Sequence, residues 1–167
     1  MLRPIAILFV VLLMFSGMSH AGGIPAPLDL RKDGQQAACR GVPVIILFSL
    51  PDCPFCATVR QNYLMSLMRD LPPRERPVIR EISVTGTGAF IGFGNEKISQ
   101  RQFAYDHGVR FAPTVMLFDG AGRSLTAPII GGDTAGLYGG YLDNALAEAA
   151  RKISDAPIVC PRRAAAT

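Results

Sequence analysis

The feature that most constrains the fold of this chain is a two-cysteine motif that directly follows a long apolar run. Residues 42–50 (VPVIILFSL) are almost all apolar and rich in β-branched side chains, a pattern typical of a strand that is buried on both faces of a sheet. A proline and an aspartate end the run, and Cys53-Pro-Phe-Cys56 follows. Apolar residues then recur every three or four positions up to residue 71, which predicts a helix with one buried side. The motif is therefore expected at the junction between a buried strand and a helix N-terminus.

This position predicts different roles for the two cysteines. Unpaired backbone N–H groups and the helix dipole favour negative charge at a helix N-terminus, so we expect the thiolate of Cys53 to be stabilised and reactive. Cys56 lies one turn further along and is expected to be more shielded. We therefore predict that Cys53 attacks a substrate disulfide and that Cys56 resolves the resulting mixed disulfide.

A permanently closed structural disulfide and half of a zinc site are the other interpretations of the Cys53–Cys56 pair. A reactive helix N-terminus is a poor location for an inert bridge. A zinc site needs four suitably spaced ligands, and the sequence contains no second Cys-x-x-Cys motif and no histidine pair. We expect neither a metal nor another cofactor.

The remainder of the chain alternates between helical and strand patterns. The last helix is expected to be capped by Asp133 or Thr134. The glycine-containing segment 85–95 predicts a loop. The resulting order, α-β-α-β-α-β-β-α, predicts an α/β fold with a central mixed four-stranded sheet flanked by helices on both faces. We expect helices over 34–40, 96–107 and 133–153, strands over 78–84, 114–118 and 123–130, a hairpin turn at 119–122, and a buried side of the last helix formed by Leu137, Tyr141, Leu142, Leu146, Ala149 and Ile153.

Four segments resemble motifs of the thioredoxin superfamily. Residues 48–56 resemble its active-site turn, and residues 112–114 (Ala-Pro-Thr) resemble the segment that carries its cis-proline. Residues 119–123 resemble its hairpin, and residues 130–132 resemble its last strand and glycine turn. In detail the chain is similar to exported bacterial thioredoxins of the SoxW type.

The resemblance implies a thioredoxin-like fold and thiol–disulfide oxidoreductase activity on protein disulfides, with Cys53 and Cys56 as the reacting residues. It also implies that Pro113 follows a cis peptide bond and that the backbone of Ala112 pairs with an extended substrate segment. The ring of Phe55 is expected to add an adaptable apolar contact to the substrate.

The chain departs from the family pattern at three positions that influence thiol chemistry. Asp52 stands where many thioredoxins have tryptophan, and its charge opposes a neighbouring thiolate. Leu47 occupies the position, six residues before Cys53, where many members have a buried acid. Phe55 brings neither a charge nor a hydrogen bond between the cysteines. These features predict an intermediate redox potential and a reductase direction, with a membrane or periplasmic thiol reductant as electron donor.

A second class of function stays open at this point. A thioredoxin-fold chaperone, or a metallochaperone, would use the same cysteines to hold a soft ion such as Cu(I). No methionine-rich or histidine-rich cluster adjoins the pair in the sequence. Nearby, Arg60 lies one turn beyond Cys56 and could face the site, but a solvated helix residue is the favoured interpretation. His107 is expected to cap the end of its own helix.

The N-terminus predicts export. A basic residue, Arg3, precedes an apolar run at 5–15 and a small-x-small site at 19–21, so we expect residues 1–21 to be a cleaved signal peptide and the protein to be periplasmic. An uncleaved membrane anchor is the alternative, but the run is shorter than the ~20 residues of a membrane span. We expect no stable membrane insertion after cleavage. The expected division of the mature chain is a flexible lead-in at 22–35, a thioredoxin-like domain at 36–155 and a tail at 156–167.

Export also affects the other two cysteines. Cys39 and Cys160 are a possible structural disulfide that would tie the tail to the first helix, because disulfides persist in oxidising compartments. Two reduced thiols are the alternative. The net charge of the whole chain is +4, without a block of basic residues or a basic–aromatic stripe, so nucleic acid is not an expected partner.

Overall fold

The computed structural model describes residues 23–155 and residue 160. The expected signal peptide, residues 1–21, and all of the expected tail except Cys160 lie outside the described residues. Among the helices of residues 23–155, none has the length and apolar character needed to cross a membrane. The elements are α2 (Leu30–Arg40), β1 (Val44–Ser49), α3 (Pro54–Thr58), the π-helix η1 (Val59–Leu64), α4 (Met65–Asp70), β2 (Val78–Ser83), β3 (Ala89–Ile91), β4 (Lys97–Ser99), α5 (Gln100–Asp106), β5 (Thr114–Phe118), β6 (Ile129–Ile130) and α6 (Tyr138–Ser154).

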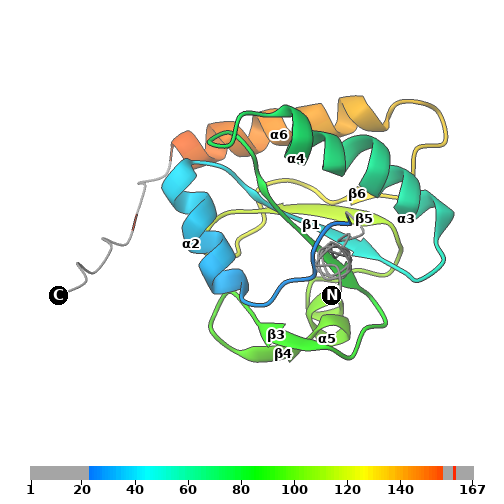
Figure 1. Cartoon of the computed structure of the whole chain (residues 1–167), viewed down its shortest axis with the longest axis horizontal. Helices are drawn as coiled ribbons and strands as arrows, with labels where there is room; N and C mark the ends of the chain where they lie inside the picture. Colours follow the sequence, from blue (N-terminus) through cyan, green and yellow to red (C-terminus); the bar gives the residue numbers. More distant parts are fainter. Residues whose placement is uncertain (1–22, 156–159, 161–167) are drawn as a thin grey trace, which may run out of the picture.

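The main sheet has four strands in the order β2-β1-β5-β6. Strand β1 runs parallel to β2 and antiparallel to β5, and β5 is antiparallel to β6. Helices α4 and α6 lie over one face of this sheet, while α2 and α5 lie on the other side (Figure 1). The α/β class and the mixed four-stranded sheet with helices on both faces are therefore confirmed.

Strand β1 is buried along its whole length because its side chains enter two separate cores. Ile45 and Leu47 pack on the face covered by η1 and α6, whereas Ile46 and Phe48 pack on the face covered by α2 and α5. This double burial explains the continuous apolar run in the sequence. It also fixes the strand end from which the two-cysteine motif emerges.

The segment before α2 differs from the flexible lead-in expected for residues 22–35. Ile24 is buried, and the carbonyl of Pro25 accepts a hydrogen bond of 3.1 Å from the N–H of Glu81 in β2. Helix α2 begins at Leu30, several residues earlier than expected. The boundary expected at residue 36 is therefore wrong, because it would cut through this helix.

Two other boundaries also differ from the expectation. The expected loop at 85–95 and the first part of the helix expected at 96–107 instead form a two-stranded hairpin, β3–β4. The helix that follows begins only at Gln100, because the hydroxyl of Ser99 caps it by accepting the N–H of Gln102. His107 is the C-cap of this helix, as expected.

The strand expected at 123–130 is reduced to the two residues of β6, apart from a single bridge between Ser124 and Phe118. Pro128 precedes β6, and a proline has no N–H to donate to a strand ladder. The turn expected at 119–122 is present, since the N–H of Gly122 donates to the carbonyl of Asp119.

Helix α6 begins later than expected and is not capped by Asp133 or Thr134. It starts at Tyr138, and its N-cap residue makes no side-chain capping bond. The Asp133 carboxylate instead accepts a hydrogen bond from the hydroxyl of Tyr63 in η1. Leu137 and Tyr141 were expected to be buried but are exposed, and the buried side of α6 is formed by Tyr138, Leu142, Ala145 and Ala149.

Candidate active site

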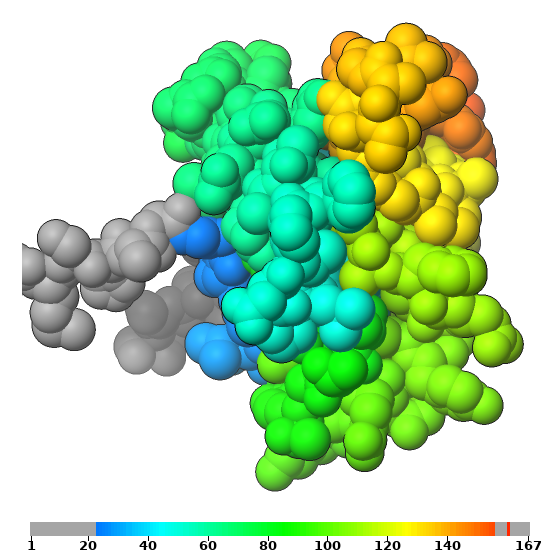
Figure 2. Space-filling view, turned by 90° about the vertical axis from the view of Figure 1, so that its right-hand side faces the viewer, coloured from blue at the N-terminus to red at the C-terminus, as the bar shows by residue number. Residues whose placement is uncertain are grey.

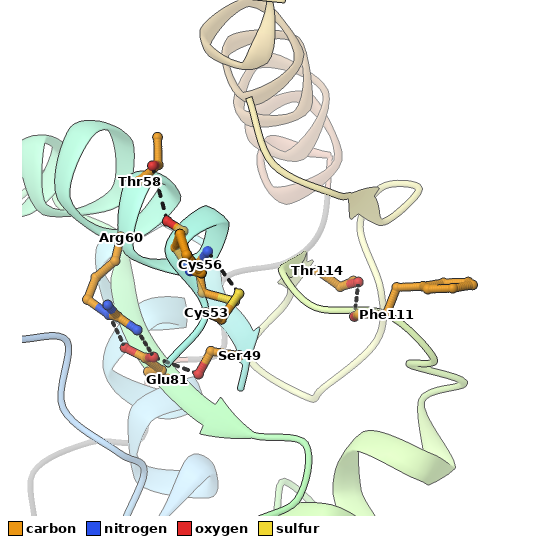
Figure 3. The surroundings of a disulfide bond; sticks show 9 residues. Ser49, Cys53, Cys56, Thr58, Arg60, Glu81, Phe111 and Thr114 are labelled. Atoms are coloured by element: carbon orange, nitrogen blue, oxygen red, sulfur yellow. Dashed lines mark hydrogen bonds and ion pairs between the residues drawn. A yellow bond between two sulfur atoms is a disulfide. The ribbon is translucent and has the colours of Figure 1, made fainter. Parts of the chain in front are cut away.

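The two cysteines of the motif form a disulfide at the start of α3, with their Cα atoms 5.2 Å apart. Cys53 is the N-cap of this helix, and its Sγ accepts a hydrogen bond of 3.1 Å from the backbone N–H of Cys56 (Figure 3). Pro54 occupies the first helical turn, where a missing N–H costs nothing. Cys53 is partly exposed and Cys56 is fully buried, so Cys53 is the cysteine of the pair that borders solvent.

The turn between β1 and α3 is tight. Asp52 has a positive φ of 53°, a left-handed conformation that aspartate tolerates better than most residues with a side chain. A tryptophan at this position would adopt that conformation at a higher cost. The left-handed backbone at residue 52 therefore suits an aspartate better than the tryptophan that many thioredoxins have at this position.

A second loop lies near the motif, because Thr114 at the start of β5 pairs with Phe48 near the end of β1. The Ala112–Pro113 peptide bond is cis, and the carbonyl of Pro113 accepts a hydrogen bond of 2.8 Å from the N–H of Gly131. The next glycine, Gly132, lies against Phe55, since a Cβ atom added there would be 2.8 Å from the Cβ of that residue. The loop after β6 thus joins the proline loop to α3. Figure 2 shows α3 in cyan at the centre of this face, beside the yellow segment around residue 130.

A polar network lies beside the disulfide on the β2 side. Glu81 of β2 accepts hydrogen bonds from Nε and Nη2 of Arg60, at 2.7 and 2.5 Å, and from the hydroxyl of Ser49, at 2.6 Å. These bonds raise the pKa of Arg60. The side chains of Arg60 and Glu81 are only 23% and 16% exposed. The network ties the helix that carries the cysteines to both parallel strands of the sheet (Figure 3).

An open pocket is lined on one side by this network and on the other by the turn that carries Cys53. Its volume is about 610 Å³. The residues that line it are Ser49, Leu50, Pro51, Asp52, Cys53, Pro54, Ala57, Arg60, Glu81 and Ser83. Within residues 23–155 and residue 160, no three His, Cys, Asp or Glu side chains are grouped so that they could hold a metal ion.

Comparison with known proteins identifies the family. Residues 30–136 match the model of the family described as the thioredoxin-like domain. The chain belongs to this family. No curated protein matches the chain.

Solved structures of similar fold are distant in sequence from this thioredoxin-like domain. A thioredoxin-fold protein from Helicobacter pylori is 11% identical with a TM-score of 0.48, over 75% of this chain and 94% of its own. Thioredoxin O2 from Arabidopsis thaliana is 14% identical with a TM-score of 0.47, over 74% and 93%. A thioredoxin from Malassezia sympodialis is 17% identical with a TM-score of 0.47, over 77% and 93%.

The favoured interpretation of Arg60 was wrong, its alternative of facing the site agrees with the structure, and Glu81 was missed altogether. Arg60 is not a solvated helix residue, because its guanidinium pairs with Glu81. Glu81 lies opposite Leu47 in the parallel register of β1 and β2. Leu47 occupies the position where many thioredoxins have a buried acid, so in this thioredoxin-like domain a carboxylate is present on the neighbouring strand instead. The sequence signal that could have indicated Glu81 was a charged residue in the middle of the strand pattern at 78–84.

The π-helix η1 directly follows α3 and supplies two polar side chains that tether this helical segment to its neighbours. Its backbone bonds span five residues, as in the bond from the N–H of Met65 to the carbonyl of Arg60. Arg60 reaches Glu81 from this segment, and Tyr63 reaches Asp133 at the other flank. Such π-turns are rare and concentrate at functional sites.

The remaining two cysteines lie far from the motif along the chain. Cys39, in the last turn of α2, forms a disulfide with Cys160, with the two Cα atoms 4.9 Å apart. Both residues are exposed. Helix α2 ends just before β1 begins, whereas the redox turn follows the end of β1. The two disulfides are therefore associated with opposite ends of this strand.

Proposed function

We propose that this protein is an exported thiol–disulfide oxidoreductase that reduces protein disulfides through Cys53 and Cys56. The observation that carries the proposal is the disulfide at the start of α3, with one cysteine partly exposed and the other buried. Together with membership of the thioredoxin-like domain family, it supports thiol–disulfide chemistry in general. Reduction as the working direction, and the periplasm as the location, are the finer parts of the proposal.

The proposed reaction begins with both cysteines reduced. The Cys53 thiolate attacks one sulfur of the substrate disulfide, a mixed disulfide forms, and the other substrate sulfur leaves as a thiolate that takes up a proton. Cys56 then loses its proton and attacks Cys53. The mixed disulfide breaks, the second substrate sulfur leaves with a proton, and the substrate has gained two electrons and two protons. A membrane or periplasmic thiol reductant restores the dithiol.

Ala112, Pro113 and Phe55 are the proposed contacts for the substrate. Among the residues that the structure describes, no backbone hydrogen bond uses the N–H or the carbonyl of Ala112, which leaves it able to pair with an extended segment. Phe55 is 53% exposed and offers an apolar surface that suits many sequences. Phe55 also offers no charge or hydrogen bond to a thiolate, which favours a reductase over a strong oxidase.

Trapping of substrate tests the proposal. The reduced Cys56→Ser variant is expected to hold protein substrates as mixed disulfides through Cys53, because the resolving thiol is absent. The reduced wild-type protein is expected to reduce insulin disulfides, and Cys53→Ser is the matched inactive control. Trapping that needs Cys56 and not Cys53 would reverse the two roles. Tight Cu(I) binding without insulin reduction would favour the metallochaperone instead.

Export is tested separately. N-terminal sequencing of the protein recovered from the periplasm is expected to begin at or near Gly22. A full-length product in the cytoplasm would overturn the proposed location and leave the chemistry in place.

A further inference from the structure

Beside the redox pair, one partly buried ion pair has no role in the reaction described above. We propose that the Arg60–Glu81 pair is a charge couple that sets how readily Cys53 forms its thiolate, with Arg60 promoting the thiolate and Glu81 restraining this effect. The inference rests on the proposed function and adds two positioning residues to it.

The first support is the shared pocket. Arg60 and Glu81 line the same pocket as Cys53, and Figure 3 shows their paired side chains below the turn that carries the cysteine. The charged residues that line this pocket are Asp52, Arg60 and Glu81. Two of these charges are negative, so Arg60 supplies the positive charge that offsets them. Without it, a thiolate on Cys53 would face two carboxylates and no cation.

The second support is the hydrogen-bond inventory. Both carboxylate oxygens of Glu81 accept bonds from Arg60, and one also accepts the hydroxyl of Ser49. Arg60 uses Nε and Nη2 in these bonds, and within the described part of the chain its Nη1 has no hydrogen bond. The guanidinium therefore keeps donors for a second anion. Its position is fixed by Glu81, which also neutralises part of its charge.

The third support is burial. With side chains 23% and 16% exposed, Arg60 and Glu81 act through a medium that screens charge less than bulk water. The neighbouring polar groups on other elements are either uncharged or paired on the other face of the sheet. Gln100 of α5 accepts the N–H of Ser83, while Arg80 of β2 pairs with Asp33 of α2 on the opposite face. When the disulfide opens, the new thiolate thus meets mainly the charges of the Arg60–Glu81 pair and of Asp52.

The experiment compares Arg60→Gln and Glu81→Gln in the full exported chain. The rate of alkylation of Cys53 is followed against pH, with the modified peptide identified by mass spectrometry. Arg60→Gln is expected to raise the pKa of Cys53 by about one unit and Glu81→Gln to lower it by a similar amount, with the double variant close to wild type. Arg60→Lys is expected to restore most of the wild-type value, because it keeps the charge.

The opposite signs separate this inference from a merely structural role. Both single substitutions break the same bidentate pair, so a simple brace would shift the pKa of Cys53 in one direction in both variants, and that result would overturn the inference. Arg69→Gln, which removes an exposed arginine on α4, is the control for net charge and is expected to cause no shift. If Arg60→Gln does not fold, a raised pKa in Glu81→Gln is sufficient to overturn the inference. A wild-type Cys53 that reacts with no disulfide would instead refute the proposed function.

Discussion

At the scale of single residues, Gly132 is a position where α3 meets its neighbour closely. A Cβ atom added there would lie 2.8 Å from the Cβ of Phe55 and 2.9 Å from its Cδ1. The Cβ of Phe55 belongs to the first turn of α3 and cannot rotate away. A side chain at residue 132 would therefore displace either α3 or the loop after β6.

Gly132→Ala is accordingly expected to destabilise the protein by roughly 1–3 kcal/mol, the usual cost of overpacking, and to slow insulin reduction. Urea unfolding and turnover measure the two effects. Gly140→Ala is the matched control, because nothing lies within 4 Å of a Cβ at this helical position of α6. The control is expected to be neutral or to stabilise by up to about 1 kcal/mol. Equal effects of the two substitutions would contradict the argument.

The residues of the site differ in how well the sequence predicts them. Cys53 at the helix start was predictable because a strand run, a proline and a helical period are all local signals. The Arg60–Glu81 pair was not, because its partners are 21 residues apart and lie on different elements, η1 and β2, whose packing has no local signal in the sequence. A charge within a strand pattern indicates a partner without indicating which residue that partner is.

At the scale of elements, the bond between Tyr63 and Asp133 connects η1 to the loop that precedes α6. The hydrogen bond from the Tyr63 hydroxyl lowers the pKa of Asp133, and the same bond raises the pKa of Tyr63. The two shifts agree in sign with a bond to an ionised carboxylate. This bond holds the loop that contains Gly132 beside α3.

Acid titration tests this contact. Because the pKa of Asp133 is lower in the folded state, its stabilising effect is complete above its unfolded value of about 3.9 and is lost as the pH falls through the folded value. Asp133→Asn is expected to be less stable than wild type at pH 6, with a difference that shrinks below about pH 4. Tyr63→Phe removes this bond but leaves the backbone N–H groups of Gly136, Leu137 and Tyr138, which also lower the pKa of Asp133, so it is expected to show a smaller difference with the same direction of pH dependence. A constant difference down to pH 2 would contradict this.

The elements themselves were predicted unevenly. Strand β1 and the helices that follow the motif were predicted correctly in kind because burial on both faces and a single apolar stripe leave clear periods. The β3–β4 hairpin was missed because its strands have three residues each, too few for an alternating pattern to stand out among glycines. The start of α6 was misplaced because Asp133 resembles a cap by type, while its carboxylate bonds to Tyr63.

At the scale of the whole molecule, the disulfide between Cys39 and Cys160 closes a loop with a sequence separation of 121 residues. Replacing both cysteines with serine is expected to lower the free energy of unfolding by roughly 4–5 kcal/mol, because the bond restricts the unfolded chain. Urea unfolding of the oxidised proteins measures the loss. The Cys53→Ser, Cys56→Ser double variant, with a separation of 3 residues, is the control and is expected to lose about 2 kcal/mol. A smaller loss for the long loop than for the short one would refute this prediction.

The segment before α2 has a consequence for solubility. It lies along the outer edge of β2, where the carbonyl of Pro25 accepts the N–H of Glu81, and it bridges to β3 through Asp29 and Ile91. An uncovered strand edge is a template on which another copy can add a strand and begin to aggregate. A chain trimmed past Leu28 would expose this edge close to the redox site. Truncation or proteolysis in this segment would thus turn a protected strand edge into one prone to self-association.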